Sequence, residues 1–229
     1  MHSIPSTDAC ICSGIRCSIK IPTATMRCTV AMPLANGSTP NLVTLDGLVD
    51  GRDGHFALDF PARDDAIHPL VRVHSACKTG DVLGSLRCDC GPQLRESLNA
   101  FARYGGLLIY LEQEGRGIGL NRKIDAYKKQ DEGYDTFEAN RVLGFRDDER
   151  DYIVAAQILN ALLPGRAIRL LTNNPEKAKS LEQYGIRVTE CVPTGVYVST
   201  ANRRYLVAKR YAGHRFNLDP NLSANHLEP

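Results

Sequence analysis

Three cysteines set close together are the feature that most constrains this chain. Cys77, Cys88 and Cys90 fall within fourteen residues, in the run VRVHSACKTGDVLGSLRCDCG. Thiolates are common zinc ligands, and a catalytic zinc site keeps three protein ligands and one open position, whereas a structural site is closed by four. On an extended backbone the side chains of Cys88 and Cys90 leave the same face, and a ten-residue loop returns Cys77 to them. We therefore predict that the fold brings the three thiols together around one catalytic Zn²⁺ per chain.

Two other interpretations of these cysteines stay open. Cysteine is among the most buried residue types, so the three could belong to the core. Alternatively, Cys28, Cys191 or His74 could supply a fourth ligand and close a structural site. Disulfides are disfavoured, because eight cysteines in 229 residues are not a dense framework and the first sixteen residues lack the apolar stretch of a signal peptide.

Charge and hydropathy exclude some classes of protein. The net charge of +2 is too small for a nucleic-acid scaffold, and no apolar run approaches the roughly eighteen residues of a membrane span. We therefore expect a cytoplasmic enzyme that has neither nucleic acid nor a membrane as its partner. We predict flexible tails over residues 1–16 and 214–229, and one catalytic domain over residues 17–213.

The pattern of residues predicts a mixed α/β fold. Residues 17–68 are rich in Gly, Thr and Asp and predict short antiparallel strands, with turns at Asn36-Gly37 and Asp53-Gly54. Further along, strands alternate with helices. The predicted strands cover 69–76, 106–114, 167–172 and 186–192, and the predicted helices cover 93–104, 148–163, 174–185 and a basic stretch near the C-terminus. The chain should thus have an N-terminal antiparallel β portion and a C-terminal αβ portion.

Two further motifs follow predicted strands. Residues 112–121 (EQEGRGIGLN) emerge at the carboxyl end of a buried strand, where open α/β sheets bind ligands. Their glycines permit a close backbone approach and Arg116 can pair bidentately with phosphate, although such a loop can also be a plain connection. Residues 172–175 (TNNP) precede a helix, whose free N-terminal amides favour an anion, although Asn174 could simply cap that helix.

Taken in order, the motifs resemble one enzyme family. RVHSxCxTGDxxxSLRCDCGxQL, QEGRxIGL, KIxAY, QDxGYDTxEAN, LGFxxDERDY and LLTNNPxK closely resemble GTP cyclohydrolase II over about residues 17–195. The resemblance implies a zinc-dependent hydrolase that opens the imidazole ring of GTP and releases formate and pyrophosphate. The product is 2,5-diamino-6-ribosylamino-4-pyrimidinone 5'-phosphate, in the first step of riboflavin synthesis. It also implies Mg²⁺ bound with the substrate triphosphate, and a homodimer.

The resemblance also assigns roles by position. Cys77, Cys88 and Cys90 match the zinc ligands. Asp148 matches the proton acceptor, Tyr127 a tyrosine of the later hydrolytic step, and Arg150 a residue described as a nucleophile at the α-phosphate. Because a guanidinium is effectively always protonated, Arg150 could equally stabilise charge on the phosphoryl group. The positions that match GTP-binding residues are Arg72, Val73, His74, Ser75, Ala76, Gln93, Glu114, Gly115, Arg116, Thr136, Thr172 and Lys177.

One departure from the family pattern leaves alternatives open. Ala76 stands where relatives commonly carry glutamate, directly before Cys77. The chain could therefore be a paralogous cyclohydrolase that acts on another nucleotide, such as a uridine nucleotide or a purine of a specialised pathway. It could also be a non-catalytic protein that binds zinc and nucleotide, although intact Asp148, Arg150 and Tyr127 favour an enzyme.

Overall fold

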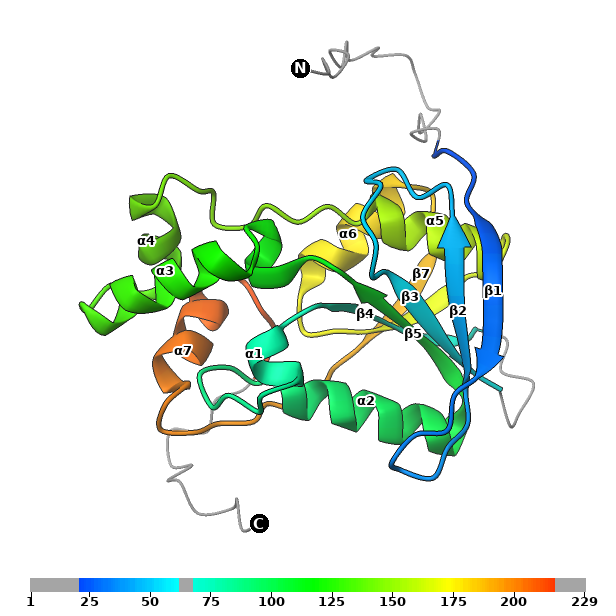
Figure 1. Cartoon of the computed structure of the whole chain (residues 1–229), viewed down its shortest axis with the longest axis horizontal. Helices are drawn as coiled ribbons and strands as arrows, with labels where there is room; N and C mark the ends of the chain where they lie inside the picture. The colour runs from blue at the N-terminus through cyan, green and yellow to red at the C-terminus, as the bar shows by residue number, and fades with distance from the viewer. Residues whose placement is uncertain (1–20, 62–67, 217–229) are drawn as a thin grey trace.

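The computed structural model describes residues 21–61 and 68–216 (Figure 1). The tail predicted over 1–16, and the tail predicted over 214–229 apart from its first three residues, lie outside this described part. Within it, the chain forms a seven-stranded sheet in the order β1-β2-β3-β5-β4-β6-β7. Helices cover both faces of the sheet (Figure 1). The predicted mixed α/β fold is confirmed.

The first half of the sheet is antiparallel. Its strands are β1 (Thr25–Ala31), β2 (Asn41–Asp46), β3 (Phe56–Phe60) and β5 (Gly106–Leu111). Gly37 and Gly54 have φ of +79° and +95°, a region that glycine adopts without strain. The two predicted turns and the antiparallel N-terminal portion are therefore confirmed.

The second half of the sheet is parallel. Its pairs join β5 to β4 (Leu70–Ser75), β4 to β6 (Ile168–Leu171), and β6 to β7 (Val188–Val192). Parallel strands need crossover connections, and α2 (Cys90–Tyr104), α5 (Ile153–Leu162) and α6 (Pro175–Gln183) provide them. β5 stops at Leu111, before the predicted end at 114, because Leu111 is its last residue with a pairing partner, Ser75.

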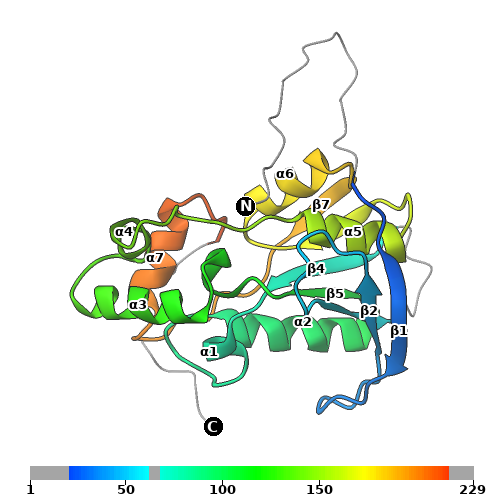
Figure 2. The same cartoon turned by 45° about the horizontal axis from the view of Figure 1, so that its top comes forward.

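Each face of the sheet has its own apolar core. On one face, Phe101 of α2 packs with Leu58, Phe60 and Leu108 of the strands. On the other face, α5 and α6 pack against the sheet and bury residues such as Ile158, which is fully inaccessible. The two views in Figures 1 and 2 show α2 on the side of the sheet opposite to α5 and α6. Parallel strands buried on both faces in this way are typical of α/β folds.

The remaining helices gather beyond the carboxyl ends of β4, β5 and β6 (Figure 2). They are α1 (Lys78–Asp81), the 3₁₀ turn η1 (Glu114–Gly117), α3 (Leu120–Asp131), α4 (Thr136–Val142) and α7 (Arg203–Tyr211). The basic helix near the C-terminus was predicted, whereas α3 and α4 were not. Asp135 and Glu138 form a reciprocal capping box at the start of α4, a local signature that the sequence itself carries.

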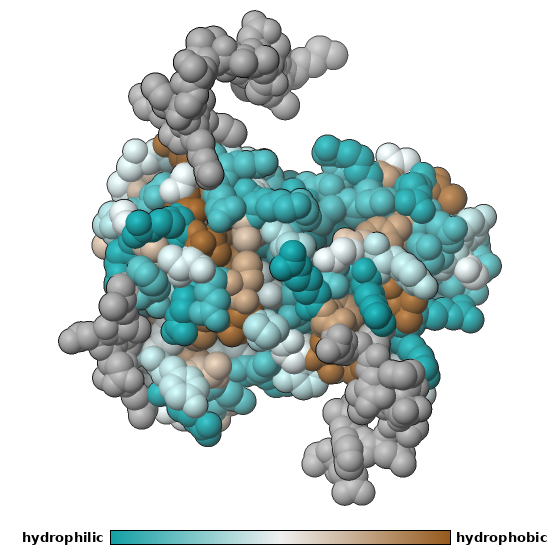
Figure 3. Space-filling model, turned by 180° about the vertical axis from the view of Figure 1, so that it is seen from behind, coloured by the Kyte–Doolittle hydropathy of each residue, from teal (hydrophilic) through white to brown (hydrophobic). Residues whose placement is uncertain are grey.

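Across residues 21–61 and 68–216, no helix combines the length and apolar character that a membrane crossing requires. The face shown in Figure 3 is mostly hydrophilic, with apolar residues in separate patches.

Candidate metal and substrate site

A cavity of about 1140 Å³, partly open to solvent, lies at the carboxyl ends of the parallel strands. Its walls come from β4, the segment that leads into α2, η1, α3, the loop between β6 and α6, and α7. This is the position at which α/β sheets bind ligands. All predicted site residues line the cavity except Val73 and Asp148. The fold thus collects side chains that are far apart in the sequence into one site.

The three thiols converge at one end of the cavity. Their sulfur atoms all lie within 4.8 Å of one another, and the Sγ atoms of Cys77 and Cys88 are 3.5 Å apart. Tetrahedral zinc with Zn–S bonds of about 2.3 Å needs sulfurs about 3.8 Å apart. A Cβ atom on Gly80 would lie 2.8 Å from the Cys88 sulfur, so only glycine fits beside the cluster. The residues present therefore fit a metal ion held by thiolates.

The predicted route to this geometry was wrong in one respect. Cys88 and Cys90 were expected on an extended backbone, but Asp89 has φ −102° and ψ 12°, and Cys90 is the first residue of α2. The turn into the helix, rather than strand alternation, brings the two sulfurs together.

The cluster offers three protein ligands to a metal ion. Cys28 and Cys191 are exposed, and Nε2 of His74 lies 3.0 Å from a carboxylate oxygen of Asp81. In the described part of the chain, the only group of potential metal ligands is formed by Cys77, Cys88 and Cys90. The alternative of a site closed by a fourth protein ligand is therefore not supported by this structure.

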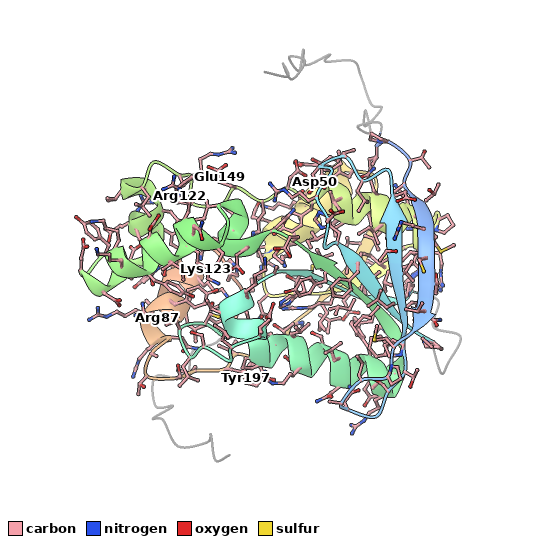
Figure 4. The ribbon with its side chains drawn as sticks, in the orientation of Figure 1. Asp50, Arg87, Arg122, Lys123, Glu149 and Tyr197 are labelled. Carbon is pink, nitrogen blue, oxygen red and sulfur yellow. The ribbon has the colours of Figure 1, made fainter. Side chains whose placement is uncertain are left out.

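Lys123 of α3 neutralises the sulfur cluster. Its Nζ donates to Sγ of Cys77 at 3.1 Å, to Oγ1 of Thr79 at 2.9 Å and to Oε1 of Glu114 at 2.7 Å. Burial alone would lower the pKa of Lys123, but the Cys77 thiolate and the Glu114 carboxylate raise it above its usual value. Hydrogen bonds from the Cys88 and Cys90 thiols, together with Lys123, hold the pKa of Cys77 below its usual range. Figure 4 shows Lys123 between α3 and α1.

Near the cluster, the carboxylate of Asp81 joins three groups. It accepts hydrogen bonds from the backbone N–H of Cys77 at 2.9 Å and from the hydroxyl of Tyr110 at 3.0 Å, and it pairs with His74. Burial lowers the pKa of His74 below its usual value, so the imidazole is neutral at pH 7. The network fixes the orientation of His74 toward the loop that carries Cys77.

Tyr127 lies beside the sulfur cluster. Its hydroxyl is 3.3 Å from Oγ1 of Thr79, and the guanidinium of Arg87 lies 4.9 Å from its ring centroid. Burial raises the pKa of Tyr127. Tyr127 is therefore a neutral phenol that can donate a proton within reach of the cavity.

The opposite wall of the cavity is cationic. Arg72 is buried and donates to Gln93 and to the carbonyl of Leu171, while its Nε has no hydrogen-bond partner in the described residues. Nζ of Lys177 donates to the carbonyl of Val73 at 2.8 Å. Burial, followed by the charges of Arg150 and Arg72, holds the pKa of Lys177 well below its usual value. An anion in the cavity would relieve both the desolvation and the repulsion.

Arg150 lines the cavity, whereas Asp148 is not among the lining residues. Nε of Arg150 donates to Oδ1 of Asp148 at 2.8 Å. Burial alone would lower the pKa of Arg150, but Tyr152 and the Asp148 carboxylate raise it above its usual value. Arg150 is thus a fixed cation, which favours charge stabilisation over a nucleophilic role. The side chain of Val73 lies in the apolar core, so only its carbonyl serves the site, through Lys177.

The glycine-rich loop has a constrained backbone. Gly115 and Arg116 both have φ of +61°, and Arg116 is the only non-glycine residue with positive φ in the described chain. This conformation is uncommon for a side-chain-bearing residue and persists only where the surroundings enforce it. Here the N–H of Glu149 donates to the carbonyl of Arg116 at 3.0 Å, and the guanidinium lies 4.3 Å from the ring centroid of Phe137. The loop thereby presents Arg116 to the cavity beside Thr136.

Several lining residues escaped sequence reasoning. They include Arg87, Lys123, Tyr205, Lys209, His214 and Phe216. Lys123 is the first residue of the motif KIxAY, so the signal was present. The last four lie after the motifs end, and no sequence pattern connects them with the site.

The chain is similar in sequence to known proteins over the region that forms most of the site. The sequence profile of the GTP cyclohydrolase II family matches residues 27–193. A GTP cyclohydrolase-2 of Aliivibrio fischeri is 48% identical over 179 residues, covering 78% of this chain and 89% of that protein. A GTP cyclohydrolase-2 of Vibrio vulnificus is 53% identical over 156 residues, covering 68% of this chain and 78% of that protein.

A longer relative matches the same region. The riboflavin biosynthesis protein RibBA of Thermotoga maritima is 52% identical over 174 residues, which cover 76% of this chain and 44% of that protein. The family predicted from the motifs is confirmed: this chain belongs to the GTP cyclohydrolase II family.

Proposed function

We propose that this protein is a hydrolase that opens the imidazole ring of GTP, with release of formate and pyrophosphate, in the first step of riboflavin synthesis. One observation carries the proposal: a single cavity joins three converging thiols to a wall of buried cations. The purine base lies toward the thiols and the triphosphate toward the cations.

The metal of the site is Zn²⁺, held by Cys77, Cys88 and Cys90. Soft thiolates favour zinc over magnesium or calcium, which prefer oxygen ligands. When bound, zinc supplies the Lewis acidity that activates water near neutral pH. The ammonium of Lys123 offsets the excess negative charge of three thiolates through its contact with Cys77.

Proton transfer falls to residues next to the thiols. Opening the ring requires a proton on the leaving nitrogen. The neutral phenol of Tyr127, oriented by Thr79, holds such a proton at its hydroxyl. His74 is neutral, and Asp81 holds both its imidazole and the backbone N–H of Cys77. The imidazole therefore offers a fixed polar group to the base.

The cations bind the phosphate chain. Arg72, Arg116, Arg150 and Lys177 line this wall, and a Mg²⁺ ion that binds with the substrate neutralises further phosphate oxygens. Because Arg150 stays protonated, it stabilises charge on the transferring phosphoryl group. Asp148 orients Arg150 and accepts its hydrogen bonds.

We expect a homodimer, as the family resemblance implies, and a cytoplasmic location, as the charge and hydropathy of the sequence indicate. Size-exclusion chromatography with light scattering of the purified protein measures the first.

The direct test of the reaction is an incubation of the zinc-loaded protein with GTP and Mg²⁺. Formate, pyrophosphate and the pyrimidine product are followed by chromatography and mass spectrometry. We expect one formate and one pyrophosphate for each GTP consumed. Binding of GTP without any turnover would instead identify a non-catalytic protein.

A second substrate class is worth testing in parallel because of Ala76. This residue is 3% exposed and presents a methyl group to the cavity directly before Cys77. A methyl group makes no hydrogen bond to a base, which leaves room for a base other than guanine. Intact GTP together with turnover of a uridine nucleotide would replace the proposed substrate.

A further inference from the structure

The segment after the matched region reaches into the cavity. The family match ends at residue 193, yet Tyr205, Lys209, His214 and Phe216 line the cavity. These residues belong to α7 and to the turn that follows it. We refer to residues 199–216 as the C-terminal segment.

Three contacts hold the C-terminal segment across both walls. The hydroxyl of Ser199 donates to the carbonyl of Leu86 at 2.9 Å, just before Cys88. Nζ of Lys209 lies 2.9 Å from Oδ1 of Asp89, the residue between Cys88 and Cys90, and the two side chains are 13% and 2% exposed. At the far end, the N–H of Arg215 donates to the carbonyl of Asn173 at 2.8 Å, beside Thr172. The segment thus bridges the sulfur side and the cationic side.

The segment is also anchored internally. Leu206 is fully buried, and Asn202 is 2% exposed. The side chain of Asn202 donates to the carbonyl of Tyr197 and accepts from the N–H of Ser199, both at 2.8 Å. These buried residues therefore fix α7, and with it the positions of Lys209 and His214.

Lys209 and His214 face the cations that bind phosphate. The charge of Lys209 is among the causes that lower the pKa of Lys177. His214 lines the cavity together with Lys209, Arg116, Arg150 and Lys177, and its Nδ1 is buried without a hydrogen-bond partner in the described residues. The salt bridge to Asp89 uses one of the three N–H donors of Lys209. Both side chains therefore have hydrogen-bonding capacity left for a ligand.

The nearby carboxylates do not neutralise the positive charge of the cationic wall. Asp148 is paired with Arg150 and Asp89 with Lys209. In the described chain, no salt bridge joins Arg72, Arg116 or Lys177 to a carboxylate. A concentrated positive field with unused donors is suited to a polyphosphate.

We propose that Lys209 and His214 are further substrate-binding residues, which the C-terminal segment contributes to the triphosphate subsite. The inference rests on the proposed function, because it takes the ligand to be the phosphate chain of the nucleotide. The segment completes the phosphate subsite from outside the region that defines the family.

The test compares two charge removals on one helix. Lys209→Gln removes the cation that faces the cavity, and Arg210→Gln removes an exposed cation from the next position of α7. Calorimetry measures the binding of inorganic tripolyphosphate, and formate release gives kcat and KM for GTP. We expect Lys209→Gln to weaken tripolyphosphate binding about tenfold, the value of one charge-assisted hydrogen bond. KM should rise in proportion, with kcat within about twofold, and Lys209→Arg should restore both.

A second variant separates binding from stability. His214→Gln leaves the salt bridge of Lys209 with Asp89 intact and should still weaken tripolyphosphate binding. Normal tripolyphosphate affinity in both Lys209→Gln and His214→Gln, with only a lower melting temperature, would overturn the inference. If the wild type binds tripolyphosphate through Lys209 but releases no formate from GTP, the proposed reaction fails while the phosphate subsite stands.

Discussion

The two walls of the cavity differ in whether their cations are paired with anionic groups. On the sulfur wall, Lys123 touches both Cys77 and Glu114, so its charge is satisfied before any ligand arrives. On the cationic wall, Lys177 donates to the carbonyl of Val73 and lies 5.7 Å from the ring centroid of Tyr152, but no salt bridge in the described chain joins it to a carboxylate, and its nearest charges are other cations. The first wall is organised for a resident metal ion, and the second for an anion that comes and goes. The cationic wall therefore reduces the stability of the empty protein, and this cost is recovered when substrate binds.

The largest effect is expected from breaking the sulfur wall. Cys88→Ser replaces a soft thiolate by a hydroxyl that ionises far less readily, so zinc should be lost. Formate release from GTP should fall by at least about a thousandfold, as expected when the metal centre of a hydrolase is removed. Metal analysis of the purified variant and a formate assay check this. A zinc-free variant with normal formate release would remove the metal from the reaction.

A matched pair of lysine substitutions tests the contrast itself. Lys123→Met breaks a buried ion pair and should lower the free energy of unfolding by about 3–5 kcal/mol. Lys177→Met removes a buried cation that has no carboxylate partner, so the free energy of unfolding should be unchanged or higher. It should nevertheless weaken GTP binding, because it deletes a phosphate-binding group. Urea denaturation of both substrate-free variants gives the two free energies.

The two free energies of unfolding decide whether the walls differ as described. Equal destabilisation by both substitutions would mean that Lys177 is a satisfied structural residue. The contrast between the two walls would then be incorrect.

A smaller effect is expected from His214. Burial, followed by the charges of Lys209, Arg116, Arg150 and Lys177, lowers its pKa to about 3, whereas an unfolded histidine has a pKa of about 6.5. Between these values the unfolded chain binds more protons, so this group reduces stability as the pH falls from about 6.5 toward 3. His214→Gln should lose less stability than the wild type between pH 7 and pH 5.

Denaturation curves across that pH range measure the difference. Added tripolyphosphate should reduce it, because an anion raises the pKa of His214 toward its usual value. Identical pH dependence of the wild type and His214→Gln would mean that the imidazole does not sense the cationic wall.

The smallest effect is expected at an exposed cysteine. Cys191 is exposed on β7 and is not part of the sulfur cluster. Cys191→Ser should therefore keep its zinc content and its formate release within about twofold, as surface substitutions usually do. Loss of zinc from this variant would point to a fourth protein ligand.

The sequence predicted the parts of the fold that depend on local pattern. The parallel strands, the turns at Gly37 and Gly54, and the start of α6 at Asn174 follow from alternation, glycine conformation and capping. α3 and α4 were not predicted, because few of their residues are buried and their sequences lack the apolar periodicity of a core helix. The motif residues themselves identified most of the cavity wall.

What the sequence could not show is which segments meet across the cavity. The positions of Lys209 and His214 depend on two long-range contacts: Asp89 with Lys209, 120 residues further along the chain, and Asn173 with Arg215, which follows α7. The pairing of Asp148 with Arg150, and its absence from the cavity wall, likewise depend on side-chain geometry. Such details arise from tertiary packing, which no local pattern encodes.

The most direct test of the account is to measure whether the two walls work separately. Inorganic tripolyphosphate is titrated calorimetrically into the wild type, Cys88→Ser and Lys177→Met. The account predicts that Cys88→Ser binds tripolyphosphate within about threefold of the wild type although it releases no formate, and that Lys177→Met binds it at least about tenfold more weakly, as expected for the loss of a charge-assisted hydrogen bond. Loss of tripolyphosphate binding in Cys88→Ser, or normal binding in Lys177→Met, would contradict it.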